Sequence, residues 1–423
     1  MTTSLKLAVP LTLIAASASA QAAPPIRHLG PAIAATTEPL GLPLGGRRLS
    51  DGRLIVDDAQ RRRLLMFDST LARVTVLADS APGAPLKYGP NPAPIIGYLG
   101  DSTLFLDAPA RAFIVLDPSG KQARVAAVPK ATDVLWFNGT RAFADPQGRI
   151  VYRGGPIGNP TKDTGQKIVV IRLPDSIPVV RASFETRTVD TAARLKLPVV
   201  QENQNVKQPE GGSKQTVMLF GASWVDDWTM TSDGFIAAVR GHDYHIDWTG
   251  PDGVHTSTPR MPFDWQRVEE AEKRRVADSA AKETQDFLDK TKAQPERLRP
   301  DGTPAPRIAA RADMLTGSLQ VMSPDAVAVA APLDRIPDYH QPFRAGTTLA
   351  DRNGNVWILP VTTTRSTGGL VYDVVNRAGT IVERVELPPE RSILEFGPGD
   401  VVYLMQKLPD GVFRVERRAI LRK

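Results

Sequence analysis

Short apolar runs, each introduced by a turn rich in Asp and Gly, recur along the whole chain. Clear copies are SDGRLIVDD (50–58), GDSTLFLDA (100–108) and DRNGNVWIL (351–359). Such turns followed by buried runs are typical of hairpin-connected β-strands. The first apolar residues of the six copies are Leu54, Leu104, Ile150, Ile236, Val356 and Val401.

The spacing of these copies indicates a repeat. Successive anchors are 50, 46, 86, 120 and 45 residues apart. Three of the intervals match the blade of a β-propeller, about 40–50 residues. The two longer intervals must contain insertions or hide a seventh unit.

Each copy continues into further strands. FIVLDPSGKQARVAAV (113–128) shows an apolar strand, a turn and another strand. We therefore expect four antiparallel strands per unit, A to D. The B and C strands are apolar on successive residues, as in a sheet covered on both faces, whereas a β-sandwich would show more alternation. The predicted fold class is all-β: a six-bladed β-propeller of four-stranded antiparallel blades, forming one domain over residues 33–421.

The two ends of this domain predict how the ring closes. The last repeat (399–421) supplies two or three strands before the chain stops. The stretch Ile33–Leu49 has no evident blade of its own, so we expect it to pair with the final blade. Closure of this kind removes an exposed sheet edge.

One segment of different character interrupts the strands. Residues 264–292 are rich in helix formers and carry acid-before-base pairs four residues apart, such as Glu269 with Lys273. They predict one inserted surface α-helix, at about 264–292 within an insertion spanning 263–294, with Asp264 as its N-cap. The helix is either a surface insertion without a role or a lid or partner-binding arm.

The N-terminus has the three parts of a secretory signal. Lys6 precedes the ten-residue apolar run Leu7–Ala16, and Ala18-Ser19-Ala20 is a small-residue cleavage site. We expect a signal peptide at 1–20, an N-terminal tail at 21–32, and export to the periplasm or the medium. No later segment is long and apolar enough to span a membrane.

Composition narrows the chemistry. The chain has no Cys, which excludes disulfides, thiolate metal sites and Cys nucleophiles. The net charge is only +6 and the basic residues are scattered, so nucleic acid is not an expected partner. We expect a monomer.

The sequence pattern DxxGxhxV followed by FDxxGxxV resembles that of the six-bladed β-propellers related to NHL-repeat proteins and gluconolactonase-type lactonases. It resembles most that of exported bacterial six-bladed propellers. The resemblance covers most of residues 33–421. It implies the propeller fold. The lactonase-type enzymes hold a divalent cation with acidic and amide side chains, but their ligand pattern does not map onto this chain, so the resemblance carries fold and not catalysis.

Loop lengths indicate which face carries function. In a four-stranded meander the A–B and C–D turns share one face, and the B–C and D–A connections share the other. The A–B and C–D turns are short in this chain, whereas the B–C and D–A connections include nearly every long segment. Binding residues usually lie on long loops, so we expect them on the B–C and D–A face. Polar and aromatic residues gather in those connections near the fourth and fifth blades, and they are the candidate ligand-binding residues: Asp226, Asp227, Trp228, Arg240, His242, His245, Tyr339 and His340.

The sequence leaves the function open. There is no GxSxG, HExxH or phosphate-binding glycine loop. The leading hypothesis is a non-catalytic binding or scaffold module for a small ligand, a peptide or an envelope protein, with no cofactor. The alternatives are a purely structural interaction module, or a metal-dependent lactonase-type hydrolase that uses a divalent cation such as calcium with Asp226, Asp227, His242 or His340.

Overall fold

The structure is a computed structural model of the full chain. It describes residues 23–84, 86–90, 94–137, 141–155, 159–161, 170–172, 176–196, 201–207, 213–219, 224–295, 309–313, 318–361 and 369–422. The expected signal peptide lies outside these residues.

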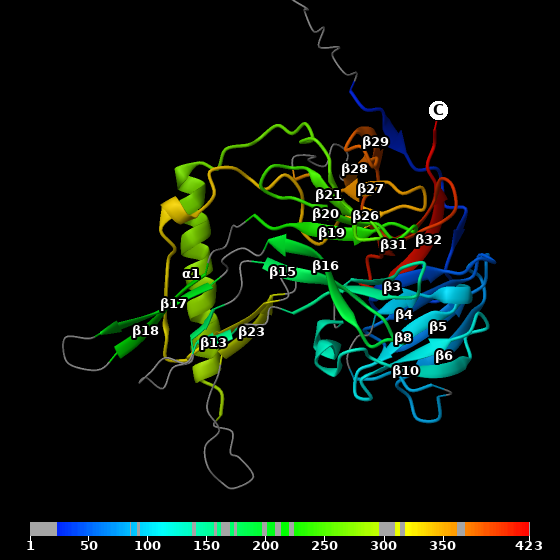
Figure 1. Ribbon diagram of the computed structural model, residues 1–423, viewed down its shortest axis with the longest axis horizontal. Coiled ribbons are helices and arrows are strands. Elements are labelled where there is room, and N and C mark those ends of the chain that lie inside the picture. Colours follow the sequence, from blue (N-terminus) through cyan, green and yellow to red (C-terminus); the bar gives the residue numbers. More distant parts are fainter. Residues whose placement is uncertain are drawn as a thin grey trace, which may run out of the picture.

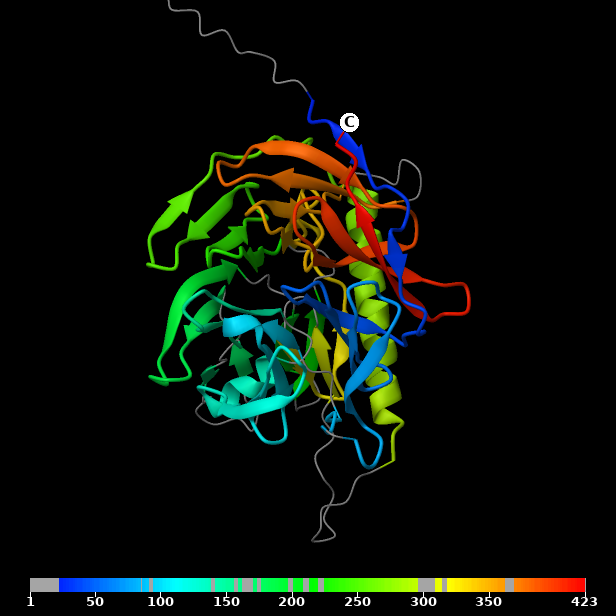
Figure 2. The ribbon, with the colours of Figure 1, turned by 90° about the vertical axis from the view of Figure 1, so that its right-hand side faces the viewer.

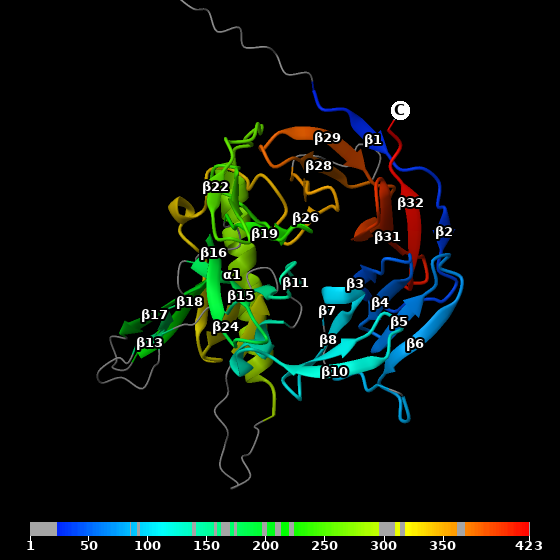
Figure 3. The same cartoon turned by 45° about the vertical axis from the view of Figure 1, so that its right-hand side comes forward.

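Six of the β-sheets surround a common centre, as Figures 2 and 3 show from two directions. The predicted six-bladed propeller is therefore confirmed, and all six anchors lie in the second strand of a blade. Blade 1 consists of β3 (Pro43–Arg48), β4 (Leu54–Asp58), β5 (Arg63–Phe67) and β6 (Val74–Asp79), and blade 2 of β7 (Ile95–Gly97), β8 (Thr103–Asp107), β9 (Ala112–Leu116) and β10 (Gln122–Ala127). Blade 3 consists of β11 (Ala142–Ala144), β12 (Ile150–Arg153), β15 (Ser176–Ala182) and β16 (Val189–Lys196). Blade 4 consists of β19 (Asp227–Met230), β20 (Ile236–Val239), β21 (Ile246–Thr249) and β22 (His255–Ser257).

The last two blades include strands from the N-terminus. Blade 5 consists of β26 (Leu349–Ala350), β27 (Val356–Ile358), β28 (Val371–Val375) and β29 (Ile381–Glu386), with β1 (Ile26–His28) added in parallel. Blade 6 consists of β30 (Arg391–Phe396), β31 (Val401–Lys407) and β32 (Phe413–Ala419), with β2 (Ala34–Ala35) as its fourth strand.

The ring closes as predicted, with one correction. Thr36 donates its amide proton to Val415 O at 2.9 Å, so the N-terminal segment does pair with the final blade. The expectation that all of Ile33–Leu49 serves this purpose was wrong, because β3 pairs with β4 and is the first strand of blade 1. The expected tail also contains a strand, β1.

A buried carboxylate stabilises this seam. Glu416 on β32 is fully buried and accepts hydrogen bonds from Arg391, Arg414 and Arg418. These guanidinium groups outweigh the effect of burial and lower the pKa of Glu416. Arg418 also donates to Gly30 O at 2.9 Å, which ties the network to the N-terminal segment.

Apolar side chains fill the junctions between blades. One cluster runs through blades 1 to 3 and includes Phe105, Phe113 and Tyr152. Others join blade 3 to 4, 4 to 5, 5 to 6 and 6 to 1. This two-sided burial explains why the inner strands are apolar on successive residues.

The face that carries the A–B and C–D turns, here called the plain rim, is built from one repeated device. Asp145 and Asp351 each accept the amide protons of the residues two and four positions later, as do Asp68, Asp117 and Asn376 in C–D turns. Gly120 follows Asp117 with φ +84°, and a side chain there would collide with Leu77. The Asp and Gly signals of the sequence therefore encode these turns.

Arginines cross all six blade junctions. For example, the Arg149 guanidinium donates to Pro251 O of the next blade at 3.0 Å. One such contact at each junction, with five of the six arginines in or beside a turn of the plain rim, is Arg53 to Pro118 O, Arg187 to Ala127 O, Arg149 to Pro251 O, Arg377 to Asp233, Arg352 to Phe396 O and Arg417 to Ser69 O.

The opposite face, here called the insertion rim, carries every accessory element, as the left side of Figure 1 shows. The two long anchor intervals hold these elements and, within the described residues, no seventh blade. The elements are β13 (Asn159–Thr161), β14 (Val170–Arg172), β17 (Gln201–Lys207), β18 (Ser213–Leu219), α1 (Glu270–Lys292), β23 (Ala309–Asp313), β24 (Ser318–Met322) and β25 (Val327–Val329). Three short 3₁₀ helices complete the structure: η1 (Leu99–Asp101), η2 (Ala131–Trp136) and η3 (Leu333–Arg335).

The predicted helix is present but begins later than expected. Its N-cap is Glu269 and not Asp264. Residues 266–268 are instead extended, because Val268 donates to Asp338 O and Gln266 accepts from the amide of His340. Leu288 of α1 packs with Val217, Ala309 and Met322, so the helix is the centre of a small accessory layer. Within the described part of the chain, no helix combines the length and apolar character needed to cross a membrane.

Candidate functional site

The eight predicted site residues all lie at or near the insertion rim of blade 4 or in the segment hydrogen-bonded beside it. They separate into four groups. The groups are a carboxylate network around Arg240, a histidine held between two aspartates, a cluster of exposed rings, and two residues that belong to the interior, while His340 stands apart from them and contacts α1.

Arg240 joins two carboxylates. Its guanidinium contacts Asp226 Oδ2 at 2.6 Å and Asp247 Oδ2 at 2.7 Å. Burial disfavours the charged guanidinium, but the two carboxylates outweigh burial and raise the pKa of Arg240. Asp226 also accepts the amide protons of Lys196 and Gly241, so its oxygens are directed at donors of this chain.

His245 lies between two carboxylates. Its Nδ1 is 2.9 Å from Asp243 Oδ1 and its Nε2 is 3.1 Å from Asp247 Oδ1. Asp247 also accepts a hydrogen bond from Ser257, and Ser257 and Arg240 together lower its pKa against the opposing effect of burial. In a Ser-His-Asp triad the imidazole separates the hydroxyl from the carboxylate, whereas here the carboxylate is in the middle. This arrangement fixes the loop and does not activate Ser257.

The predicted site residues did not include Asp243, Asp247 and Ser257. A signal was available for Asp247, which follows His245 by two residues at the start of β21, because side chains two apart in an extended chain share a face. Asp243 instead lies in the turn before the strand, where Tyr244 has a positive φ.

Four partly or largely exposed rings meet at the insertion rim, and we call Trp224, His242, Trp265 and Tyr339 the aromatic corner. The Trp224 ring is 4.8 Å from that of His242 and 6.1 Å from that of Trp265, centroid to centroid. The Trp265 and Tyr339 rings are 6.4 Å apart and nearly perpendicular. Trp224 Nε1 donates to Tyr339 O at 2.9 Å, which fixes the corner.

The corner is assembled from three separate connections between strands. Trp224 precedes β19, His242 lies between β20 and β21, and Trp265 and Tyr339 both lie between β22 and β26. Of the predicted site residues, His242 contacts the Trp224 ring and Tyr339 contacts the Trp265 ring. Trp265 was missed because it was placed on the helix.

His340 links the corner to α1. Its Nε2 is 3.5 Å from Glu272 Oε2. The next residue of the helix, Lys273, contacts Asp338 Oδ1 at 2.5 Å and donates to Ile336 O. The accessory layer is thus anchored beside the corner.

Asp227 and Trp228 belong to the interior of the ring. Asp227 is buried and accepts the amide protons of Trp228 and Thr348. Arg141, which enters from blade 3, donates to Trp228 O and lies 3.8 Å from Asp227. Trp228 is buried against Phe143 and fills space between blades, so its place in the predicted site is structural.

Each residue proposed for a divalent cation contacts another group of the chain. Asp226 pairs with Arg240, Asp227 accepts from the amide of Thr348, His242 lies against the Trp224 ring and His340 lies near Glu272. Among the described residues, no three His, Asp or Glu side chains are grouped so that they could hold a metal ion.

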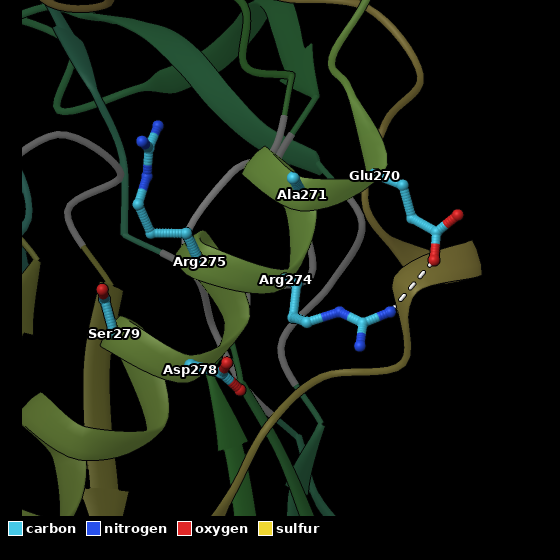
Figure 4. A pocket seen from close by; sticks show the side chains of 6 residues that line it. All are labelled: Glu270, Ala271, Arg274, Arg275, Asp278 and Ser279. Atoms are coloured by element: carbon cyan, nitrogen blue, oxygen red, sulfur yellow. Dashed lines mark hydrogen bonds and ion pairs between the residues drawn. The ribbon is translucent and has the colours of Figure 1, made fainter.

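Two hollows lie away from the corner. A cleft of about 230 Å³ between blades 3 and 4 is lined by Arg240, Asp247, His255 and Ser257, among others. A larger depression of about 590 Å³ lies along α1, but the six side chains that line it all come from that helix (Figure 4). Groups on one exposed helix face do not converge on a ligand, so this depression is not a candidate site.

No family model and no curated protein sequence matches the chain. Solved structures do resemble it. A streptogramin B lyase shares 13% identity over 92% of this chain and 96% of its own, with a TM-score of 0.36. A gluconolactonase from Xanthomonas campestris shares 13% over 93% and 98% (TM-score 0.36), and the calcium-binding protein regucalcin from Agrobacterium tumefaciens shares 11% over 93% and 97% (TM-score 0.37). At these identities the likeness concerns the propeller fold and no more.

Proposed function

We propose that the protein is a binding module and that its ligand surface is the aromatic corner on the insertion rim. The observation that carries the proposal is the contrast in burial of large rings. Trp248, Trp357, Tyr88 and Phe113 are fully buried between blades, whereas Tyr339 is 42% exposed and stands beside the partly exposed Trp224 and Trp265.

Exposed aromatic side chains are costly to leave in water and are enriched at binding hot spots. Trp265 packs partly against the buried cluster between blades 4 and 5, whereas Tyr339 belongs to none of the buried clusters and keeps its ring largely in solvent. The Arg240, Asp226 and Asp247 network holds the segments that carry Trp224 and His242. The segments that carry Trp265 and Tyr339 are hydrogen-bonded to each other. The corner is therefore pre-organised, which favours binding.

We also propose that the protein acts after export, since the signal-like segment at 1–20 precedes the domain. N-terminal sequencing of the protein recovered outside the cytosol tests this, and we expect the mature chain to begin at about Gln21.

Crystals soaked in phenol test the ligand surface, because small aromatic probes collect where a protein binds apolar groups. We expect phenol to be bound against Trp265 and Tyr339 in the parent protein and to be absent from crystals of Tyr339→Leu. Phenol bound only in the cleft between blades 3 and 4, or on the plain rim, would overturn the proposal.

A further inference from the structure

We infer that the aromatic corner binds an organic cation, specifically a quaternary ammonium group such as the trimethylammonium head of choline. This inference rests on the proposed function of the same surface. It adds the chemical class of the ligand, and it follows from the ring geometry, the surrounding charge and the acceptors already in use.

The rings are arranged as the walls of a corner and not as a stack. The planes of Trp224 and Trp265 are inclined at 54°, and those of Trp265 and Tyr339 at 82°. Aromatic faces are electron-rich, and they attract a cation within about 6 Å of the ring centroid. With neighbouring centroids 6.1 and 6.4 Å apart, one cation can lie that close to several rings at once.

The surrounding charge is negative in a protein that is positive as a whole. The segments that carry the corner (224–228, 241–245, 260–272 and 334–344) contain nine acidic residues and four basic ones, or six basic ones when Arg240 and Lys273, which pair with Asp226 and Asp338, are included. Asp243, Asp264 and Asp338 each directly neighbour a ring residue in sequence. Such an imbalance favours a cationic ligand over a neutral or anionic one.

Two cations near the corner are paired with carboxylates, and the cation that does lie on aromatic rings lies on others. Among the described residues, only Arg377 is stacked on aromatic rings, at 3.8 Å from the Phe235 centroid and 4.9 Å from that of Trp248. Lys273 is paired with Asp338, and Arg260 lies 3.7 Å from Asp243. Arg377 is the cation that lies on the rings of Phe235 and Trp248. At the corner we infer that a ligand supplies the cation.

Two hydrogen-bond acceptors beside the rings are already in use, which favours a cation that needs few of them. Tyr339 O accepts from Trp224 Nε1, and Gln341 Oε1 accepts from the amide of Val225. A primary ammonium or a guanidinium would need several acceptors to replace its water, because a buried N–H group without a partner is costly. A quaternary ammonium has no N–H group that needs a partner, so leaving water costs it little free energy in lost hydrogen bonds.

Titration calorimetry of the full-length protein with choline, against its neutral carbon isostere 3,3-dimethylbutan-1-ol, isolates the contribution of the charge. We expect choline to bind at least about tenfold more tightly than the isostere, which is the scale of a partly desolvated cation–π contact. We expect Tyr339→Leu and Trp265→Leu to weaken choline binding about tenfold each, and Tyr339→Phe to retain it. Leu99→Ala, a change at an exposed residue far from the corner, is the matched control and should have no effect.

Equal affinity for the two compounds, or choline binding that survives both Leu variants, would overturn the inference. The phenol soak separates this failure from that of the proposed function. If phenol is bound at the corner but choline does not bind, the surface binds ligands of another class. If neither binds there, both proposals are wrong. Thermal melting of each variant confirms that it is folded.

Discussion

The plain rim and the insertion rim of this propeller are formed by the same strands but follow different rules. On the plain rim, short turns repeat one motif in which an Asp or Asn side chain accepts two amide protons, and arginines cross to the neighbouring blade. On the insertion rim the connections differ in length and content from blade to blade. There the partners come from segments far apart in the sequence, as Trp224 and Tyr339 show.

The carboxylates of the two rims also differ in their pKa shifts. In the plain-rim turns, hydrogen bonds from Ser119 and the Lys121 amide lower the pKa of Asp117, and those from Thr70 and nearby amides lower that of Asp68. Toward the insertion rim the shifts go both ways. Burial raises the pKa of Asp57, on β4 at the end nearer this rim, to about 7, although a hydrogen bond from Tyr88 opposes this, whereas Ser257 and Arg240 lower the pKa of Asp247 against burial. The plain-rim carboxylates named here stabilise turns, whereas the insertion-rim side holds a costly carboxylate as well as a paired one.

The largest effect should follow from breaking a plain-rim turn. The nearly buried Asp351 accepts from the amides of Asn353 and Asn355 and from Trp357 Nε1. Asp351→Ala leaves these donors unpaired, and we expect it to cost about 4 kcal/mol of the free energy of unfolding. Urea denaturation measures this. Asp351→Asn keeps an acceptor and should cost less than half as much, and equal losses would contradict the hydrogen-bond account.

The next effect concerns the dependence of stability on pH. Because the folded-state pKa of Asp57 is raised to about 7, its favourable contribution is complete below the unfolded pKa near 4 and is lost as the pH rises through 7. We expect this to cost roughly 3 kcal/mol between pH 4 and pH 8. Asp57→Asn mimics the protonated acid, so its stability should fall by that much less over the same range. Parallel pH profiles for the two proteins would refute the raised pKa.

A smaller effect should come from one crossing arginine. Arg149 contacts Asp145 at 2.6 Å and donates to Pro251 O of the next blade. Arg149→Met keeps the aliphatic stem and should cost about 1.5 kcal/mol, since the group is partly exposed. Arg260→Met on the insertion rim is the matched change and should leave the melting temperature unaltered. An equal loss in both variants would remove the distinction between the rims.

The smallest effect on stability should be seen at the aromatic corner. We expect Tyr339→Leu to change the free energy of unfolding by less than about 0.5 kcal/mol, as is usual for exposed positions. Tyr244→Leu provides the contrast, because Tyr244 is 1% exposed between blades 4 and 5 and should cost about 3 kcal/mol. A large loss in Tyr339→Leu would mean that the ring supports the fold.

The plain rim was predictable from the sequence because its information is local. Each Asp and Gly motif acts within five residues, so Leu54 and the other five anchors could be found one at a time. Because alternate connections in a four-stranded meander lie on the same face, the insertions could then be placed on one rim. Closure by the N-terminal segment was also found, although β3 was assigned to the wrong blade because Gly45 and Gly46 give it no strand-like pattern.

The candidate site was only partly predictable because its contacts are non-local. The sequence suggested His242 and Tyr339 as neighbours but could not show that Trp265 joins them, since residues 266–268 leave the helical path to pair with residues 338–340. It also could not separate Asp226, which faces the rim, from Asp227, which faces the interior one residue later.

The most direct test of the account is a ¹⁵N-indole NMR spectrum of the six tryptophans during addition of choline. The proposal places Trp224 and Trp265 in the ligand surface and Trp228, Trp248 and Trp357 in the interior. We predict that the signals of Trp224 and Trp265 shift in a saturable manner while those of the three interior tryptophans do not. Unchanged Trp224 and Trp265 signals, or equal shifts in the interior tryptophans, would contradict the assignment of ligand binding to the insertion rim.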